Sequence, residues 1–245
     1  MASWSDSGKG FNSGELGLRI AELYQSIQGE GLLTGVPSVF VRTSGCNLRC
    51  WFCDTPYTSW EPEGETRELA EVIAATLAYE CQHVVITGGE PMIVPELVPL
   101  TRVLAEAGRH ITIETAGTRF LQLDCHLMSV SPKLANSTPS PERDAGWHLR
   151  HEQTRHAPAV IRQLVATYET QFKFVIDQPA DCEEVERYLV EFPEIDRRRV
   201  LLMPQGTDLE TLSRTAAWLE PYCSEHGLRY CPRKHVEWFG FRRGT

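Results

Sequence analysis

The stretch that decides the fold is Cys46-Asn-Leu-Arg-Cys50-Trp-Phe-Cys53-Asp54-Thr55, where three cysteines stand at a CxxxCxxC spacing. Thiolates are soft ligands that suit iron–sulfur clusters. Because a [4Fe–4S] cluster has four irons, three cysteines leave one iron without a protein ligand. An open coordination position is a place for chemistry, as open zinc sites show by analogy. The spacing therefore predicts a reactive [4Fe–4S] cluster held by Cys46, Cys50 and Cys53.

Two other metal sites use related spacings. A structural zinc site needs a fourth ligand, normally from a second CxxC or a His pair, and the next candidates, Cys81 and His83, lie far along the chain. A two-cluster ferredoxin run has a fourth cysteine followed by proline, whereas Thr55-Pro56 follows the third cysteine here. Both alternatives fit the sequence less well than the open cluster.

Length and composition indicate one domain. The chain has 245 residues, of which 42% are hydrophobic, and α/β barrels of this length form single domains. We expect a core domain over residues 19–245 that includes a C-terminal extension. Residues 1–18 are polar and Gly/Ser-rich without an apolar segment, which predicts a flexible tail and no secretory signal.

The formal net charge of −9 argues against a nucleic-acid partner, which needs a basic surface. No apolar run is long enough for a membrane span. The five cysteines outside the motif are scattered and form no disulfide scaffold, so we expect idle thiols in a reducing, cytoplasmic location.

The pattern along the chain favours an α/β fold. Short apolar segments at 36–41, 83–86, 111–115, 127–130, 172–176 and 200–203 predict strands, and segments 65–79, 95–107, 157–168, 181–192 and 208–226 predict helices. Residues 19–27 suggest an edge strand, and residues 136–146 a polar loop. Alternating strands and helices indicate parallel βαβ units, whose ligand site lies at the carboxyl ends of the strands.

A second motif, Gly88-Gly89-Glu90-Pro91, follows one of the predicted strands. Glycines let the backbone approach a ligand closely, and carbonyls with a carboxylate supply the acceptors that an ammonium group needs. Together, in this order, the two motifs resemble those of the radical S-adenosylmethionine (SAM) enzymes. In that superfamily the open iron binds the amino and carboxylate groups of SAM, and reduction splits SAM into methionine and a 5′-deoxyadenosyl radical. The resemblance implies a partial (β/α)6 barrel with fewer or shorter helices.

The resemblance also implies where SAM binds. Glu90 would accept from the amino group, and Phe52 would lie near the adenine. Glu114 is either a SAM contact or a rim carboxylate, and Ser131-Pro132-Lys133 either reaches SAM or is a plain turn. The implied SAM-binding residues are Phe52, Cys53, Asp54, Gly89, Glu90, Glu114, Ser131, Pro132 and Lys133.

Further blocks resemble one family, the 7-carboxy-7-deazaguanine synthases of queuosine (deazapurine) biosynthesis. The blocks are Tyr24-Gln-Ser-Ile27-Gln28-Gly29-Glu30-Gly31, Thr34-Gly-Val-Pro37, Phe40-Val-Arg42, Cys53-Asp54-Thr55, Val85 to Pro91, Val130 to Lys133, and the closing stretch His235 to Gly244. They cover most of residues 20–133, while the resemblance assigns no role to residues 135–168.

The family reaction is a ring contraction by a carbon–nitrogen lyase. The nucleoside radical removes a hydrogen from C6 of 6-carboxy-5,6,7,8-tetrahydropterin, the substrate radical rearranges, and loss of ammonia gives 7-carboxy-7-deazaguanine. SAM is regenerated and Mg²⁺ is required. The resemblance further implies a homodimer and an electron donor such as a flavodoxin.

The residues suit such a substrate. Arg42 would hold its carboxylate bidentately, unless it only forms a salt bridge at a strand end. The pterin edge would be read by Ile27, Gln28, Gly29 and Glu30, with Thr87 as another contact. Thr55 would bind Mg²⁺, which prefers hard oxygen ligands, or it would only cap its turn.

We expect no catalytic side chain, since the nucleoside radical abstracts the hydrogen and the protein positions two ligands. The basic end, with Arg233, Lys234, His235, Arg242 and Arg243, either approaches the anionic substrate or is a solvated tail, and we leave it out of the predicted site. Two other functions stay open: a glycyl-radical activase, which would lack the Gln28–Gly31 block and Thr55, and an iron–sulfur electron-transfer protein, whose cluster would be fully ligated.

Overall fold

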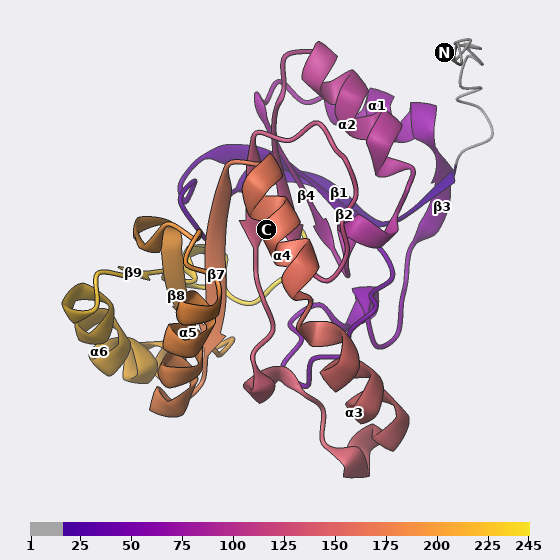
Figure 1. Ribbon diagram of the computed structural model, residues 1–245. Coiled ribbons are helices and arrows are strands. Elements are labelled where there is room, and N and C mark those ends of the chain that lie inside the picture. Colours follow the sequence, from indigo (N-terminus) through magenta and orange to yellow (C-terminus); the bar gives the residue numbers. More distant parts are fainter. Residues whose placement is uncertain (1–16) are drawn as a thin grey trace, which may run out of the picture.

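A nine-stranded mixed sheet, in the order β3-β1-β2-β4-β5-β6-β7-β8-β9, organises the computed structural model, which describes residues 17–245 (Figure 1). From β2 (Pro37–Thr43) onward neighbouring strands run parallel. At the other end β1 (Gly17–Ile27) runs antiparallel to both β2 and β3 (Glu65–Glu68). Since β3 and β9 end the strand order, the barrel is partial.

The parallel strands that follow β2 are β4 (His83–Gly88), β5 (His110–Thr115), β6 (Leu127–Val130), β7 (Thr170–Ile176), β8 (Val200–Pro204) and the short β9 (Arg229–Tyr230). The crossovers carry α1 (Leu69–Leu77), α2 (Leu97–Glu106), α3 (Pro141–Arg155), α4 (Pro158–Thr167), α5 (Pro179–Glu191) and α6 (Leu209–Glu225), and α7 (Lys234–Phe239) follows β9. A loop alone joins β5 to β6. The predicted partial (β/α)6 barrel is therefore confirmed.

Alternation along the strands decides which side chains reach the inner face. One face packs against the helices through buried apolar side chains, among them Val39, Val41, Val84, Ile86, Ile111, Ile113, Phe172 and Phe174. Successive side chains of a strand point to opposite faces. The residues between these apolar ones therefore face the inside of the partial barrel, and they include Phe40, Arg42, Val85, Thr87, Glu114 and Lys173.

Three sequence-based expectations need correction. The strand expected at 19–27 is not an edge strand, because residues 65–68, expected to be helical, form β3 outside it. The loop expected at 136–146 contains the start of α3, since Ser140 caps the helix by accepting from Arg143 N and Pro141 stands at its first turn. In Figure 1 this helix projects beyond the sheet.

The third correction concerns the expected tail over residues 1–18. Gly17 and Leu18 belong to β1 and pair with β3, and the rest of that segment lies outside the described residues. None of the helices formed by residues 17–245 has both the length and the apolar character needed to cross a membrane.

Candidate active site

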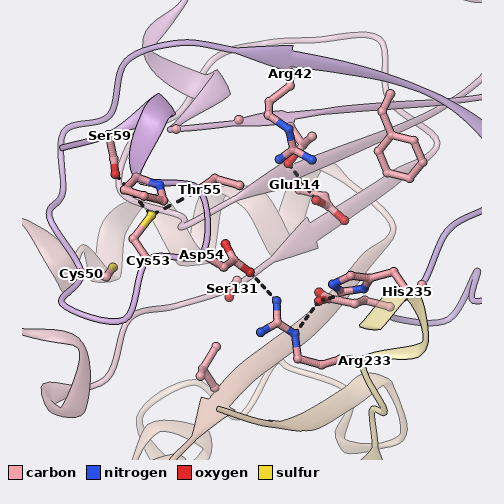
Figure 2. A pocket seen from close by; sticks show the side chains of 18 of the residues that line it. Arg42, Cys50, Cys53, Asp54, Thr55, Ser59, Glu114, Ser131, Arg233 and His235 are labelled. Carbon is pink, nitrogen blue, oxygen red and sulfur yellow. Dashed lines mark hydrogen bonds and ion pairs between the residues drawn. The ribbon is translucent and has the colours of Figure 1, made fainter. Parts of the chain in front are cut away.

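A cavity of about 510 Å³ lies inside the partial barrel, within the size range of small-molecule sites. Its wall is built by the cysteine loop after β2, the segment after β1, the inner face of the parallel strands and the C-terminal segment (Figure 2). All of the predicted site residues line this cavity except Glu90 and Pro132. Residues predicted to hold the cluster, SAM and the substrate thus line one cavity.

The three cysteines of the motif lie on one part of the cavity wall with free thiols. Burial raises the pKa of the Cys46 and Cys50 thiols to about 12, so iron binding to thiolates must release protons. Leu48 N donates to Cys46 Sγ over 3.4 Å. Each thiolate of a cluster binds a different iron, so the three thiols need not converge on one point. Within residues 17–245 no three His, Cys, Asp or Glu side chains are grouped closely enough to hold a single metal ion. The donor set fits an iron–sulfur cluster.

The cysteine loop is held from outside the cavity by residues of the 135–168 segment, to which the sequence assigned no role. His151 of α3 is fully buried and its Nδ1 accepts from Arg49 N over 3.2 Å, while Nε2 lies 2.9 Å from Ser137 Oγ. Burial lowers the pKa of His151 to about 4. On the other side Trp60 Nε1 donates to Cys50 O over 2.9 Å. The loop thus keeps its shape through contacts outside the cavity.

Glu90 fixes the loops rather than lining the cavity. Its carboxylate is fully buried and accepts from Thr115 Oγ1 at 2.7 Å, Ala116 N at 2.8 Å and Met92 N at 3.0 Å. Burial raises its pKa. The contact to the amino group of SAM stays a prediction, since three hydrogen bonds leave about one acceptor position of the carboxylate unused.

Beside it, Gly89 reaches the cavity because it has no side chain. A Cβ there would come within 2.0 Å of Gly45 O, so only glycine allows this approach of the two loops. Across the cavity Lys133 Nζ donates to Ser131 O at 2.6 Å and to Ser131 Oγ at 2.8 Å. The Ser131–Lys133 turn thus presents a hydroxyl and a cation together, while Pro132 lies outside the cavity.

Glu114 joins the residues predicted to bind substrate. It accepts from Thr87 Oγ1 at 2.8 Å and from Gln28 Nε2 at 3.2 Å. β1 runs antiparallel to β2, so its carboxyl end does not lie at the edge where the parallel strands end. Gln28, which follows β1, therefore does not lie at that edge. The segment after β1 instead crosses the inner face, where Leu32 N donates to Gln171 Oε1 of β7 at 2.8 Å.

Arg42 both lines the cavity and forms the ion pair that the sequence left as an alternative. Its Nε donates to Glu22 Oε2 at 2.7 Å and its Nη2 to Tyr24 Oη at 3.0 Å. The Thr55 side chain lines the cavity without capping the 3₁₀ turn that follows it. Its Oγ1 accepts from Thr58 Oγ1 at 3.3 Å and lies 3.8 Å from Cys53 Sγ.

The sequence reasoning missed a group of charged residues around Glu30. Lys173 Nζ donates to Glu30 Oε2, and Arg233 Nε donates to Oε1 at 3.2 Å. Burial alone would raise the pKa of Glu30, but Lys173 and Arg233 outweigh it and hold the pKa well below its usual range. Lys173 stands between Phe172 and Phe174 of a predicted strand, so alternation could have placed it on the inner face.

The first part of the basic C-terminal segment is built into the cavity wall and is not a solvated tail. Arg233 is 6% exposed, and His235 lies in the same wall with Nδ1 3.8 Å from Glu30 Oε1 (Figure 2). Arg242 and Arg243 also line the cavity. No local pattern in the sequence predicts this, because the contacts join residues far apart in the chain.

Comparisons with known proteins agree with this geometry. Residues 40–130 match the Radical SAM superfamily. A 7-carboxy-7-deazaguanine synthase from Rhodopirellula baltica is 45% identical over 232 residues, which cover 94% of this chain and 90% of that protein. The chain belongs to the 7-carboxy-7-deazaguanine synthase family.

Other members agree with this assignment. The 7-carboxy-7-deazaguanine synthase of Halobacterium salinarum is 46% identical over 229 residues, covering 89% of each chain. The crystal structure of QueE from Escherichia coli superposes with a TM-score of 0.68 at 25% identity and covers 94% of this chain and all of that one. The chain is thus a radical SAM enzyme, and the family implies a [4Fe–4S] cluster and SAM at the site.

Proposed function

We propose that this enzyme converts 6-carboxy-5,6,7,8-tetrahydropterin to 7-carboxy-7-deazaguanine with loss of ammonia. The observation that carries the proposal is the joint placement of the three motif cysteines, the Gln28–Glu30 segment and Arg42 on one cavity. Membership of the synthase family favours this reaction over a glycyl-radical activase or an electron-transfer protein.

The cysteine side of the cavity would hold the two cofactors. Cys46, Cys50 and Cys53 would hold the cluster, which with SAM supplies the radical that abstracts hydrogen. Ser131 Oγ and the Lys133 ammonium suit the ribose hydroxyls and the carboxylate of SAM, because a hydroxyl donates and accepts while an ammonium donates only.

The opposite side would hold the pterin. Glu114 and Glu30 supply carboxylate acceptors for the amino and N–H groups of its edge, and Gln28 adds an amide. Arg42, held by Glu22 and Tyr24, would bind the substrate carboxylate. Thr55, between this side and Cys53, would place one hydroxyl on Mg²⁺, which binds few protein groups and keeps several waters. These side chains position the ligands and exclude water.

The test is anaerobic reconstitution with iron and sulfide, followed by turnover with SAM, a reductant and the pterin. Product at the mass of the deazaguanine acid, dependent on pterin and Mg²⁺, is expected, with no net loss of SAM. Cys50→Ala is the matched control and should lose iron and product together. Release of deoxyadenosine without pterin turnover would reject this reaction while keeping the superfamily. The homodimer, the cytoplasmic location and the flavodoxin-type electron donor stay predictions.

A further inference from the structure

Arg233 is the one residue, among those that the structure describes near the cavity, whose side chain bonds to both loops that flank the two proposed ligand positions. Its Nε donates to Glu30 Oε1 at 3.2 Å and its Nη2 to Asp54 Oδ2 (Figure 2). Its Nη1 donates to Gly206 O at 2.7 Å. Glu30 follows Gln28 in the segment after β1, and Asp54 stands between Cys53 and Thr55. A single guanidinium therefore joins the pterin side of the cavity to the cysteine side.

The backbone around Arg233 is also tied to the segment after β1. Lys234 N donates to Gly29 O at 3.0 Å, and Gly31 N donates to Cys231 Sγ at 3.2 Å. A Cβ on Gly29 would come within 2.6 Å of His235 N, so the two segments are in close contact. Cys231 N in turn donates to Leu202 O of β8 at 2.9 Å. This anchoring fixes the Cα of Arg233 and leaves its side chain to set the distance between Glu30 and Asp54.

The mechanism proposed above assigns no role to Arg233, although it is 6% exposed and charged. A buried charge is retained only when its partners are well placed. Here each of the three guanidinium nitrogens has its own acceptor, and a planar fork can satisfy all three at fixed angles, whereas the compact ammonium of a lysine cannot. Only arginine fits this site, because the three acceptors lie where the three guanidinium nitrogens can each reach one of them.

We propose that Arg233 is a positioning residue that keeps the Gln28–Glu30 segment in register with the cysteine loop, acting through Glu30 and Asp54. The inference rests on the proposed function, because it concerns the distance between a pterin on one loop and the radical source on the other. Hydrogen abstraction needs near-contact geometry, and a small misplacement lowers the rate strongly. Loss of register should therefore let SAM be cleaved without product, because the radical forms but does not meet the substrate hydrogen.

Lys173 provides the matched control. It bonds to the same carboxylate, Glu30, but it has no contact to Asp54. If Arg233 acted only by holding Glu30 ionised, removing Lys173 would have the same consequence as removing Arg233. If Arg233 couples two loops, only its removal, or that of Asp54, should uncouple SAM cleavage from product.

The experiment compares reconstituted wild type, R233M, R233K, D54N and K173M for iron and sulfide content, pterin KM, and the ratio of deoxyadenosine released to product formed. We expect full iron content in every variant. R233M and D54N should raise the ratio at least fivefold at saturating pterin. R233K should also raise it, since it keeps the charge but not the three bonds. K173M should raise the KM with an unchanged ratio.

A wild-type ratio in R233M, or an equal rise in K173M, would overturn the proposal. If R233M does not fold, D54N and R233K decide the question, and wild-type ratios in both would overturn it equally. The proposed function is judged separately, by whether the wild type makes the deazaguanine acid at all.

Discussion

Ser59 Oγ lies 3.2 Å from Cys53 Sγ, and the Ser59 side chain is buried in the wall of the cavity (Figure 2). When Cys53 binds iron as a thiolate, the hydroxyl is the only possible donor of this pair. Hydrogen bonds to the sulfurs of an iron–sulfur cluster are one of the factors that set its reduction potential. A donor stabilises the added negative charge of the reduced state.

Ser59→Ala should therefore lower the reduction potential of the cluster while leaving the iron content unchanged. An EPR-monitored redox titration measures the shift. Ser44→Ala is the matched control. Ser44 stands two residues before Cys46, its Oγ is buried without a hydrogen-bond partner among the described residues, and its loss should leave the potential unchanged. Equal potentials in the wild type and Ser59→Ala would show that this hydroxyl does not donate to the thiolate.

Arg42→Ala should raise the pterin KM roughly 10- to 100-fold, because a hydrogen bond to a charged group contributes about 1.5–3 kcal/mol. Steady-state kinetics at saturating SAM measures it. Glu22→Gln is the comparison, since its amide oxygen still accepts from Arg42 Nε, and we expect a smaller rise. An unchanged KM in Arg42→Ala would leave the residue as a structural ion pair only.

Thr55→Ala should raise the Mg²⁺ concentration needed for half-maximal activity by about tenfold or more, as the loss of a group that orients a metal site does. SAM cleavage without pterin should persist, because Thr55 holds no iron. Thr55→Ser keeps the hydroxyl and should keep the Mg²⁺ dependence of the wild type. The hypothesis fails if serine and alanine at this position respond alike.

Burial of His151 makes the stability of the chain depend on pH. Its folded-state pKa of about 4 lies below the ordinary value of 6.5. The unfolded chain therefore binds the proton more readily, and the stability present above pH 6.5 falls as the pH drops toward 4, by up to about 3 kcal/mol. His151→Gln should flatten this part of the profile of melting temperature against pH.

The control for that profile is His156→Gln, at a side chain that is 40% exposed and pairs with Glu191. This variant should keep the steep fall in melting temperature between pH 6.5 and 4. Parallel profiles for His151→Gln and the wild type would contradict the assignment of this fall to His151.

Local patterns predicted the parts of the fold that local physics controls. The apolar runs identified the six parallel strands from β2 to β8, and the cysteine spacing identified the loop after the first of them. Glu90 shows where such inference stops. A carboxylate after a strand end can contact a ligand, tie loops together or do both, and only the structure shows that Glu90 accepts from Thr115 and Ala116.

Long-range contacts account for the rest. The antiparallel pairing of β1 carries Gln28 across the inner face, and a basic segment more than 200 residues further along the chain meets Glu30 there. Neither the antiparallel pairing of β1 nor the contact between Arg233 and Glu30 produces a periodicity or a motif in the sequence. The role of His151 could not be predicted for the same reason, because it depends on a long-range hydrogen bond from Arg49 N of the cysteine loop.

The most direct test of the account is turnover with a pterin that carries deuterium at C6. If the cavity holds the pterin beside SAM as proposed, deuterium should appear in SAM recovered after turnover, together with the deazaguanine acid as product, and both should be lost in Cys50→Ala. Recovery of all the deuterium in unreacted pterin, while deoxyadenosine accumulates without label, would contradict the central claim.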